Sequence, residues 1–134
     1  MKTVFADTAY FLALVSQRDR LHEQAMALAQ NPPGDLLTTE WILTEVGDGL
    51  SAPTVRSRFV RLCALLRSRE DVEIVPATSQ LFERGCTLFE ARPDKHWSLT
   101  DCLSFVVMKE RSLEAALTPD EHFEQAGFRR LMHP

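Results

Sequence analysis

Short apolar runs and longer runs with helical periodicity alternate along this chain. Apolar residues that recur every three or four positions predict helices, and short β-branched runs bounded by turn residues predict strands. The segments that predict strands are 2–7 (KTVFAD), 36–39 (LLTT), 72–76 (VEIVP), 113–118 (LEAALT) and 128–132 (FRRLM). The segments that predict helices are 8–16, 20–30, 39–50, 52–70, 78–92, 98–111 and 119–127.

Strands that alternate with helices over the whole length favour a parallel sheet covered by helices on both faces. We therefore expect an α/β fold, an α/β/α sandwich with a short parallel central sheet. No repeat, low-complexity tract or linker interrupts the pattern, so residues 1–134 are expected to form a single domain. Ser98 is the expected N-cap of the helix that follows it, and Pro119 is the expected first residue of the last helical segment.

Composition indicates a protein with reduced cysteines, no membrane span and an acidic net charge. The chain has 134 residues, of which 25% are charged, and three widely spaced cysteines, which favour reduced thiols over disulfides or a zinc site. Asp7 breaks the N-terminal apolar run, and no run is long enough for a membrane span, so we expect a cytoplasmic protein without a membrane anchor. The formal net charge of −4 counts against a nucleic-acid partner, unless some carboxylates are gathered to hold cations.

Four acidic side chains lie at or near the ends of predicted elements. Asp7 closes the first strand, Asp120 follows the fourth strand, Asp101 lies in the first turn of its helix, and Glu45 lies in the helix after the second strand. Ligands of open parallel sheets bind beyond the carboxyl ends of the strands. Each acid alone also has a simpler interpretation, as a helix cap for the three aspartates and as a solvated side chain for Glu45. Their joint arrangement, with a hydroxyl residue beside each aspartate, favours a common site.

Four segments that follow one another along the chain carry a family resemblance. They are FADTAYFLAL, LTEVGDGL, WSLTDCLSFVVM and ALTPDEHFEQAGF. In this order they resemble the successive motifs of the PIN-domain family, specifically its VapC-like toxin ribonucleases. The resemblance covers essentially the whole chain, and its third and fourth motifs are the most specific. Pro119 departs from many relatives, but a proline suits the start of a helix.

The resemblance implies a metal-dependent ribonuclease, the toxin of a type II toxin–antitoxin pair. The acidic residues of the family correspond here to Asp7, Glu45, Asp101 and Asp120, as catalytic residues and as metal ligands. The second motif also contains other acids, and Glu45 is preferred because TEVGDG best matches the glutamate of the family followed by an apolar residue. Asp48, one turn further on, remains an additional candidate.

Chemistry supports a cation at such a cluster. Two carboxylates about 4.5 Å apart repel by roughly 3–4 kcal/mol at an effective dielectric constant near 20, so four of them are expected to take up protons or to bind hard cations. Mg²⁺ and Mn²⁺ prefer oxygen ligands, and we expect one of them here. Thr8, Ser98 and Thr100 are candidates to hold carboxylates or bound water in place. For His122, close to Asp120 in sequence, we expect a surface or packing role.

The same resemblance implies an RNA substrate, a cognate antitoxin protein and a homodimer. Arginines crowd the predicted helix 52–70, and further basic residues lie late in the chain. These side chains could contact RNA phosphates or simply form a solvated helix face, while exposed apolar residues of that helix could receive an amphipathic antitoxin segment.

Two other functions remain as alternatives. A catalytically silent PIN-like module would only bind a partner, although the four acids argue against it. Another α/β phosphohydrolase is less favoured, because a dehalogenase-like phosphatase needs a second aspartate at position 9, which is Ala9. A receiver domain needs paired acids after its first strand, and these are also missing.

Overall fold

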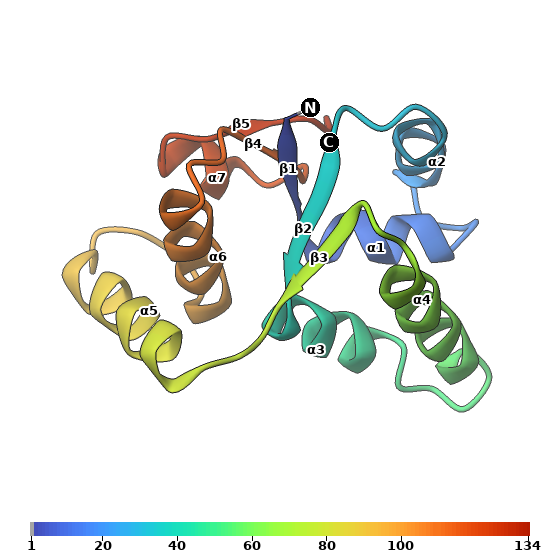
Figure 1. The fold of residues 1–134 in the computed structure, drawn as a ribbon, viewed down its shortest axis with the longest axis horizontal. Coiled ribbons are helices and arrows are strands. Elements are labelled where there is room, and N and C mark those ends of the chain that lie inside the picture. Colours follow the sequence, from blue (N-terminus) through green and yellow to red (C-terminus); the bar gives the residue numbers. More distant parts are fainter. Residues whose placement is uncertain (1) are drawn as a thin grey trace.

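A computed structural model describes residues 2–134 as a five-stranded, fully parallel sheet between two groups of helices (Figure 1). The strand order is β3-β2-β1-β4-β5, so the first strand is central. The predicted α/β/α sandwich with a short parallel sheet is confirmed. The strands are β1 (Thr3–Ala6), β2 (Asp35–Thr39), β3 (Val72–Val75), β4 (Ala115–Leu117) and β5 (Arg129–Arg130).

The helices form the two outer layers. Figure 1 shows α5, α6 and α7 on one side of the sheet and α1, α2 and α4 on the other, with α3 beyond the carboxyl end of β2. Within residues 2–134, none of the helices combines the length and hydrophobicity needed to cross a bilayer. The helices are α1 (Thr8–Val15), α2 (His22–Gln30), α3 (Glu40–Gly49), α4 (Arg56–Ser68), α5 (Ser79–Ala91), α6 (Leu99–Glu110) and α7 (Glu121–Gln125).

The register of the two central strands brings the residues after them together. Ala6 at the end of β1 pairs with Leu117 at the end of β4, and the Asp7 amide donates a hydrogen bond to the Leu117 carbonyl at 3.2 Å. Because parallel strands end at the same edge of the sheet, Asp7 and Thr118 become neighbours there. Distant parts of the sequence thus meet at this edge without any long loop.

Aromatic side chains join α6 and α7 to the sheet. The Phe105 ring of α6 packs edge-on against Trp97, with centroids 5.0 Å apart, and against Phe123 of α7, with centroids 4.9 Å apart. Phe123 also meets Phe5 of β1 at 6.2 Å, and all four rings are buried. Each such edge-to-face pair contributes about 1 kcal/mol beyond the area it buries. This aromatic cluster, Phe5, Trp97, Phe105 and Phe123, therefore fixes the starts of α6 and α7 relative to β1.

The start of the last helix differs from the prediction. Pro119 is not the first helical residue, because α7 begins at Glu121 and Asp120 is its N-cap. The Asp120 carboxylate accepts a hydrogen bond from the His122 amide at 2.9 Å, and an aspartate is among the best N-caps. Pro119 lies in the preceding loop, where its carbonyl accepts a hydrogen bond from Arg130 at 2.7 Å. The predicted Ser98 cap of α6 is confirmed.

Gly85 lets α5 lie close to α6, and this contact gives a stability prediction. A Cβ at position 85 would overlap the Leu103 side chain and lie 3.4 Å from its Cα. Gly85→Ala should therefore lower the free energy of unfolding by about 1–3 kcal/mol, in spite of the better helix propensity of alanine. Urea denaturation measures this change.

Gly49→Ala is a matched control in another helix. A Cβ there would meet only the flexible end of the Leu12 side chain, at 3.2 Å, so this variant should be neutral or stabilised by up to about 1 kcal/mol. Equal effects of the two substitutions would contradict the close packing of α5 on α6.

Candidate active site

Asp7 is the buried member of the candidate site. It follows β1 directly, and only 8% of its surface is exposed. Burial raises the pKa of its carboxyl from the ordinary value of 3.8 to about 7, and the negative charges of Asp101 and Asp120 act in the same direction. Hydrogen bonds from the Thr118 hydroxyl and the Thr8 amide oppose this rise by stabilising the carboxylate. The protein thus holds a carboxyl group where its ionised form is disfavoured.

Asp101 and Asp120 lie at the N-termini of two helices that face each other. Asp101 completes a capping box with Ser98: its Oδ2 accepts from the Ser98 amide at 3.1 Å, and its own amide donates to Ser98 Oγ at 3.0 Å. The simpler interpretation of Asp101 and Asp120 as caps is therefore correct. Both remain partly exposed, at 15% and 36% of their side-chain surface, so each carboxylate can cap a helix and also bind a ligand.

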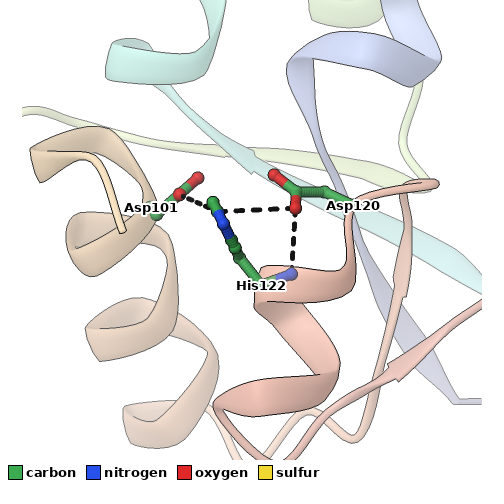
Figure 2. Close-up of side chains that lie close together, drawn as sticks. All are labelled: Asp101, Asp120 and His122. Atoms are coloured by element: carbon green, nitrogen blue, oxygen red, sulfur yellow. Dashed lines mark hydrogen bonds and ion pairs between the residues drawn. The ribbon is translucent and has the colours of Figure 1, made fainter. Parts of the chain in front are cut away.

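His122 lies between these two carboxylates, as Figure 2 shows. Its Nδ1 is 3.0 Å from Asp101 Oδ2 and 3.4 Å from Asp120 Oδ1. Ligand atoms of Asp101, Asp120 and His122 all lie within 4.8 Å of one another. The structure therefore places this histidine within the cluster, whereas the sequence predicts a surface or packing position for it.

Glu45 reaches the site through the residue after Asp7. The Thr8 hydroxyl donates a hydrogen bond to Glu45 Oε1 at 2.6 Å, which ties α3 to the start of α1. Glu40, a competing acid of the same helix, accepts from the Ala77 amide instead, at 2.7 Å. Asp48 is exposed, and within residues 2–134 no contact joins its side chain to the other acids. Of the acids in this helix, Glu45 alone has a hydrogen bond that ties it to the Asp7 region.

The hydroxyl residues near the acids differ in what they contact. Thr8 and Ser98 bond to Glu45 and Asp101 as described above, whereas the described residues offer no hydrogen bond to the Thr100 side chain. Thr118, which the sequence marks only as a neighbour of Asp120, is fully buried. Its hydroxyl donates to Asp7 Oδ2 at 2.8 Å and accepts from the Asp120 amide at 3.1 Å. Thr118 thus connects the two aspartates of the central strands.

Three polar contacts hold α7 and the loop before it against their surroundings. Trp97 Nε1 donates to Gln125 Oε1 at 3.0 Å, which links the segment before α6 to the end of α7. Arg130 bonds to the Pro119 carbonyl and pairs with Glu124 at 2.9 Å. Together with the aromatic cluster, these contacts fix the direction in which Asp120 and His122 point.

The donor set fits a divalent cation. Asp7, Asp101 and Asp120 present carboxylate oxygens, which hard cations such as Mg²⁺ and Mn²⁺ prefer. The raised pKa of Asp7 is the physical signature of a buried acid without sufficient positive charge nearby. Among the described residues, no lysine or arginine forms an ion pair with these three aspartates; their one basic contact is His122. A divalent cation at this edge of the sheet would compensate two of the three negative charges.

Comparison with known proteins places this geometry in a family. The model of the PIN domain matches residues 4–129. The chain is 26% identical over 125 residues to the "23S rRNA-specific endonuclease VapC20" of Mycobacterium tuberculosis, covering 93% of this chain and 95% of that protein.

Solved structures agree with this match. The crystal structure of that VapC20, described as a "Sarcin-Ricin loop cleaving toxin", superposes with a TM-score of 0.87 at 25% identity, covering 96% of this chain and 98% of the other. FitAcB from Neisseria gonorrhoeae gives a TM-score of 0.69 at 15% identity and 95% coverage of both chains. A toxin–antitoxin complex from Klebsiella pneumoniae gives 0.62 at 19% identity, covering 88% and 87%; these two show a shared fold. With a family match over almost its whole length, the chain belongs to the PIN-domain family.

Proposed function

We propose that this chain is an endoribonuclease of the VapC type that requires Mg²⁺ or Mn²⁺ and acts as the toxin of a toxin–antitoxin pair. Residues 1–134 would act as one nuclease domain. Asp7, Glu45, Asp101 and Asp120 are the proposed catalytic residues and metal ligands. The class of function predicted from the sequence agrees with the endonuclease toxin to which the chain is similar.

One observation carries the metal dependence. Asp7 is only 8% exposed and has no lysine or arginine partner among the described residues, yet it lies at the carboxyl edge of the sheet, where the charges of Asp101 and Asp120 act on it. Such an arrangement costs folding stability and gains nothing unless a cation binds there. The buried Asp7 is therefore the strongest support for a divalent ion as cofactor.

Each residue of the proposed site has a distinct task. Asp7 and Asp101 are the principal metal ligands, and Asp120 completes the shell directly or through water. Glu45, oriented by Thr8, faces the same edge and orients the attacking water. A bound divalent ion would bind the scissile phosphate and make water a stronger nucleophile. Ser98 and Thr118 keep the carboxylates in place through the hydrogen bonds described above, and Thr100 remains a candidate for bound water.

The proposed substrate is RNA. The similar VapC20 is named for action on 23S rRNA and for cleavage of its sarcin–ricin loop, which makes that loop the first substrate to test. Arg61 and Arg67 on α4 are exposed, and neither has an ion pair within residues 2–134. Such free cations could contact RNA phosphates, and bound metal ions would reduce the repulsion between RNA and the acidic site.

A groove between α1, α2 and α4 supports the antitoxin as partner. Its lining is mostly apolar, with Leu14, Leu62 and Leu65 shared between two adjoining hollows. The charged residues of the lining are Arg58, Arg61, Arg69 and Asp71. Leu65 in this groove is 52% exposed, so α4 offers apolar surface there that an amphipathic helix would cover. The proposed occupant is a helix of the cognate antitoxin.

A homodimer and a cytoplasmic location complete the proposal. Phe82 and Phe89, seven residues apart on α5, are 45% and 51% exposed, and two turns of a helix bring such positions onto one face. A second copy of the chain is the occupant we propose for this face. RNA cleavage controlled by a cognate antitoxin would take place in the cytoplasm.

Substitution of one acid tests the proposed activity. Asp101→Asn keeps an oxygen that can accept from the Ser98 amide but removes the charge, so α6 should stay capped. Cleavage of a sarcin–ricin loop oligonucleotide in Mn²⁺ should fall by at least about a hundredfold. Electrophoresis of end-labelled RNA measures the rate. Asp48→Asn, the same change at an exposed acid, should cleave as fast as the unaltered protein, and an equally active Asp101→Asn protein would refute the proposed site.

Metal binding should also raise the thermal stability of the protein. A ligand at about one hundred times its Kd stabilises the folded state by about 2.7 kcal/mol, which corresponds to roughly 5–15 °C in Tm for a domain of this size. Calorimetry with and without Mn²⁺ measures the shift. Asp7→Asn should remove most of it, and an unshifted Tm of the unaltered protein at millimolar Mn²⁺ would favour a silent binding module.

When a chelator keeps the site free of metal, the buried Asp7 carboxyl should make the free energy of unfolding depend on pH. It loses its proton near pH 3.8 in the unfolded chain and near 7 in the folded protein. Between these values the folded state holds the extra proton, so stability falls as the pH rises. Asp7→Asn should change the free energy of unfolding little near pH 4 and raise it by roughly 2–4 kcal/mol near pH 8. Urea denaturation at both pH values measures this difference; Asp48→Asn should show no such pH-dependent gain.

A further inference from the structure

We infer that His122 supplies a nitrogen ligand to the same divalent ion that Asp101 and Asp120 bind. This inference rests on the proposed metal-dependent nuclease and adds a member to its ligand set that the four-acid pattern does not contain. An imidazole nitrogen among carboxylate oxygens would also change which metal ion the site prefers.

The distances suit three ligands of one ion. His122 Nδ1 lies 3.0 Å from Asp101 Oδ2 and 3.4 Å from Asp120 Oδ1. In octahedral coordination with ligands at about 2.1 Å, neighbouring ligand atoms lie about 3.0 Å apart. All three groups offer ligand atoms within 4.8 Å of one another, so small side-chain rotations would let one ion contact all of them.

The backbone around His122 is fixed before any ion binds. Its amide donates to Asp120 Oδ1 at 2.9 Å, and the next residue, Phe123, is fully buried in the aromatic cluster. Figure 2 shows the imidazole directed from the first turn of α7 into the gap between the two carboxylates. Only 25% of the His122 side chain is exposed. A histidine with merely a surface role would not need this orientation.

A hydrogen bond to Asp101 is the competing explanation of the same contact. A hydrogen bond requires a proton on Nδ1, whereas coordination requires the Nδ1 lone pair. The two roles therefore differ in what the ion contacts and not in where the ring lies. Substitution by asparagine separates them, since its side-chain amide nitrogen can occupy a position close to Nδ1 and donate a hydrogen bond but is a poor metal ligand.

Metal preference follows from the ligand set. An all-oxygen site suits Mg²⁺, whereas an imidazole nitrogen favours transition-metal ions. The protein should accordingly bind Mn²⁺ more tightly than Mg²⁺. Loss of the nitrogen ligand should reduce that advantage by about tenfold, mainly through weaker Mn²⁺ binding.

Pulsed electron paramagnetic resonance of Mn²⁺ bound to the full chain tests this inference directly. A directly bound imidazole gives ¹⁴N modulation of the electron spin echo, and growth with ¹⁵N-labelled histidine should replace it by a ¹⁵N signal. His122→Asn should abolish the nitrogen signal and weaken Mn²⁺ binding by about tenfold in titrations. His96→Gln, at an exposed histidine ahead of α6, should retain both the signal and the affinity.

The outcomes are distinct. Tight Mn²⁺ binding without a histidine nitrogen signal in the unaltered protein overturns the role of His122 and leaves the metal-dependent nuclease intact; this result does not depend on whether any variant folds. Unchanged affinity and an unchanged nitrogen signal in His122→Asn would also overturn it. Absence of Mn²⁺ binding together with absence of RNA cleavage would instead remove the proposed function, and the inference with it.

Discussion

Repulsion among carboxylates at one edge of the sheet is the constraint to which the rest of the structure responds. Ligand atoms of Asp101 and Asp120 lie within 4.8 Å of each other, and two carboxylate charges at that distance repel by about 3–4 kcal/mol at an effective dielectric constant near 20. Three devices offset this cost. The helix N-termini of α6 and α7 direct backbone amides at Asp101 and Asp120. The Thr118 hydroxyl donates a hydrogen bond to Asp7. His122 lies between Asp101 and Asp120.

Packing of the hydrophobic core offsets the free-energy cost of bringing these acids together. Phe5 of β1 and Phe105 of α6 both pack against Phe123 of α7. The side chains that define the site are therefore the immediate neighbours of side chains that define the fold: Phe123 follows His122, and Phe5 precedes Asp7 by two residues. Because these site residues lie close to core residues in the sequence, core packing holds the acids in place against their repulsion.

Sequence reasoning captured the parts of the structure that periodicity and chain order determine. The sequence predicts Asp7 and Asp120 at one edge because parallel strands end together, and it predicts Ser98 as a cap because a serine followed three residues later by an acid is a local signal. Glu45 needed the family resemblance, since nothing local separates it from Glu40; only the tertiary contact with Thr8 does. The direction of the His122 ring could not be predicted, because it depends on packing around Phe123. Pro119 was misplaced because Asp120 is the stronger cap.

The capping box of α6 gives Asp101 a structural role that Asp7 does not have. Asp101 stabilises its helix as well as the site, so most replacements there would damage folding along with chemistry. Asp7 has the opposite effect, because burial of its ionised carboxyl lowers the free energy of unfolding. If the chain is the proposed toxin, an inactivating substitution at Asp7 would therefore leave the folded protein more intact than one at Asp101. Such an inert copy would keep the apolar groove between α1, α2 and α4, so it would still compete for the partner proposed to bind there.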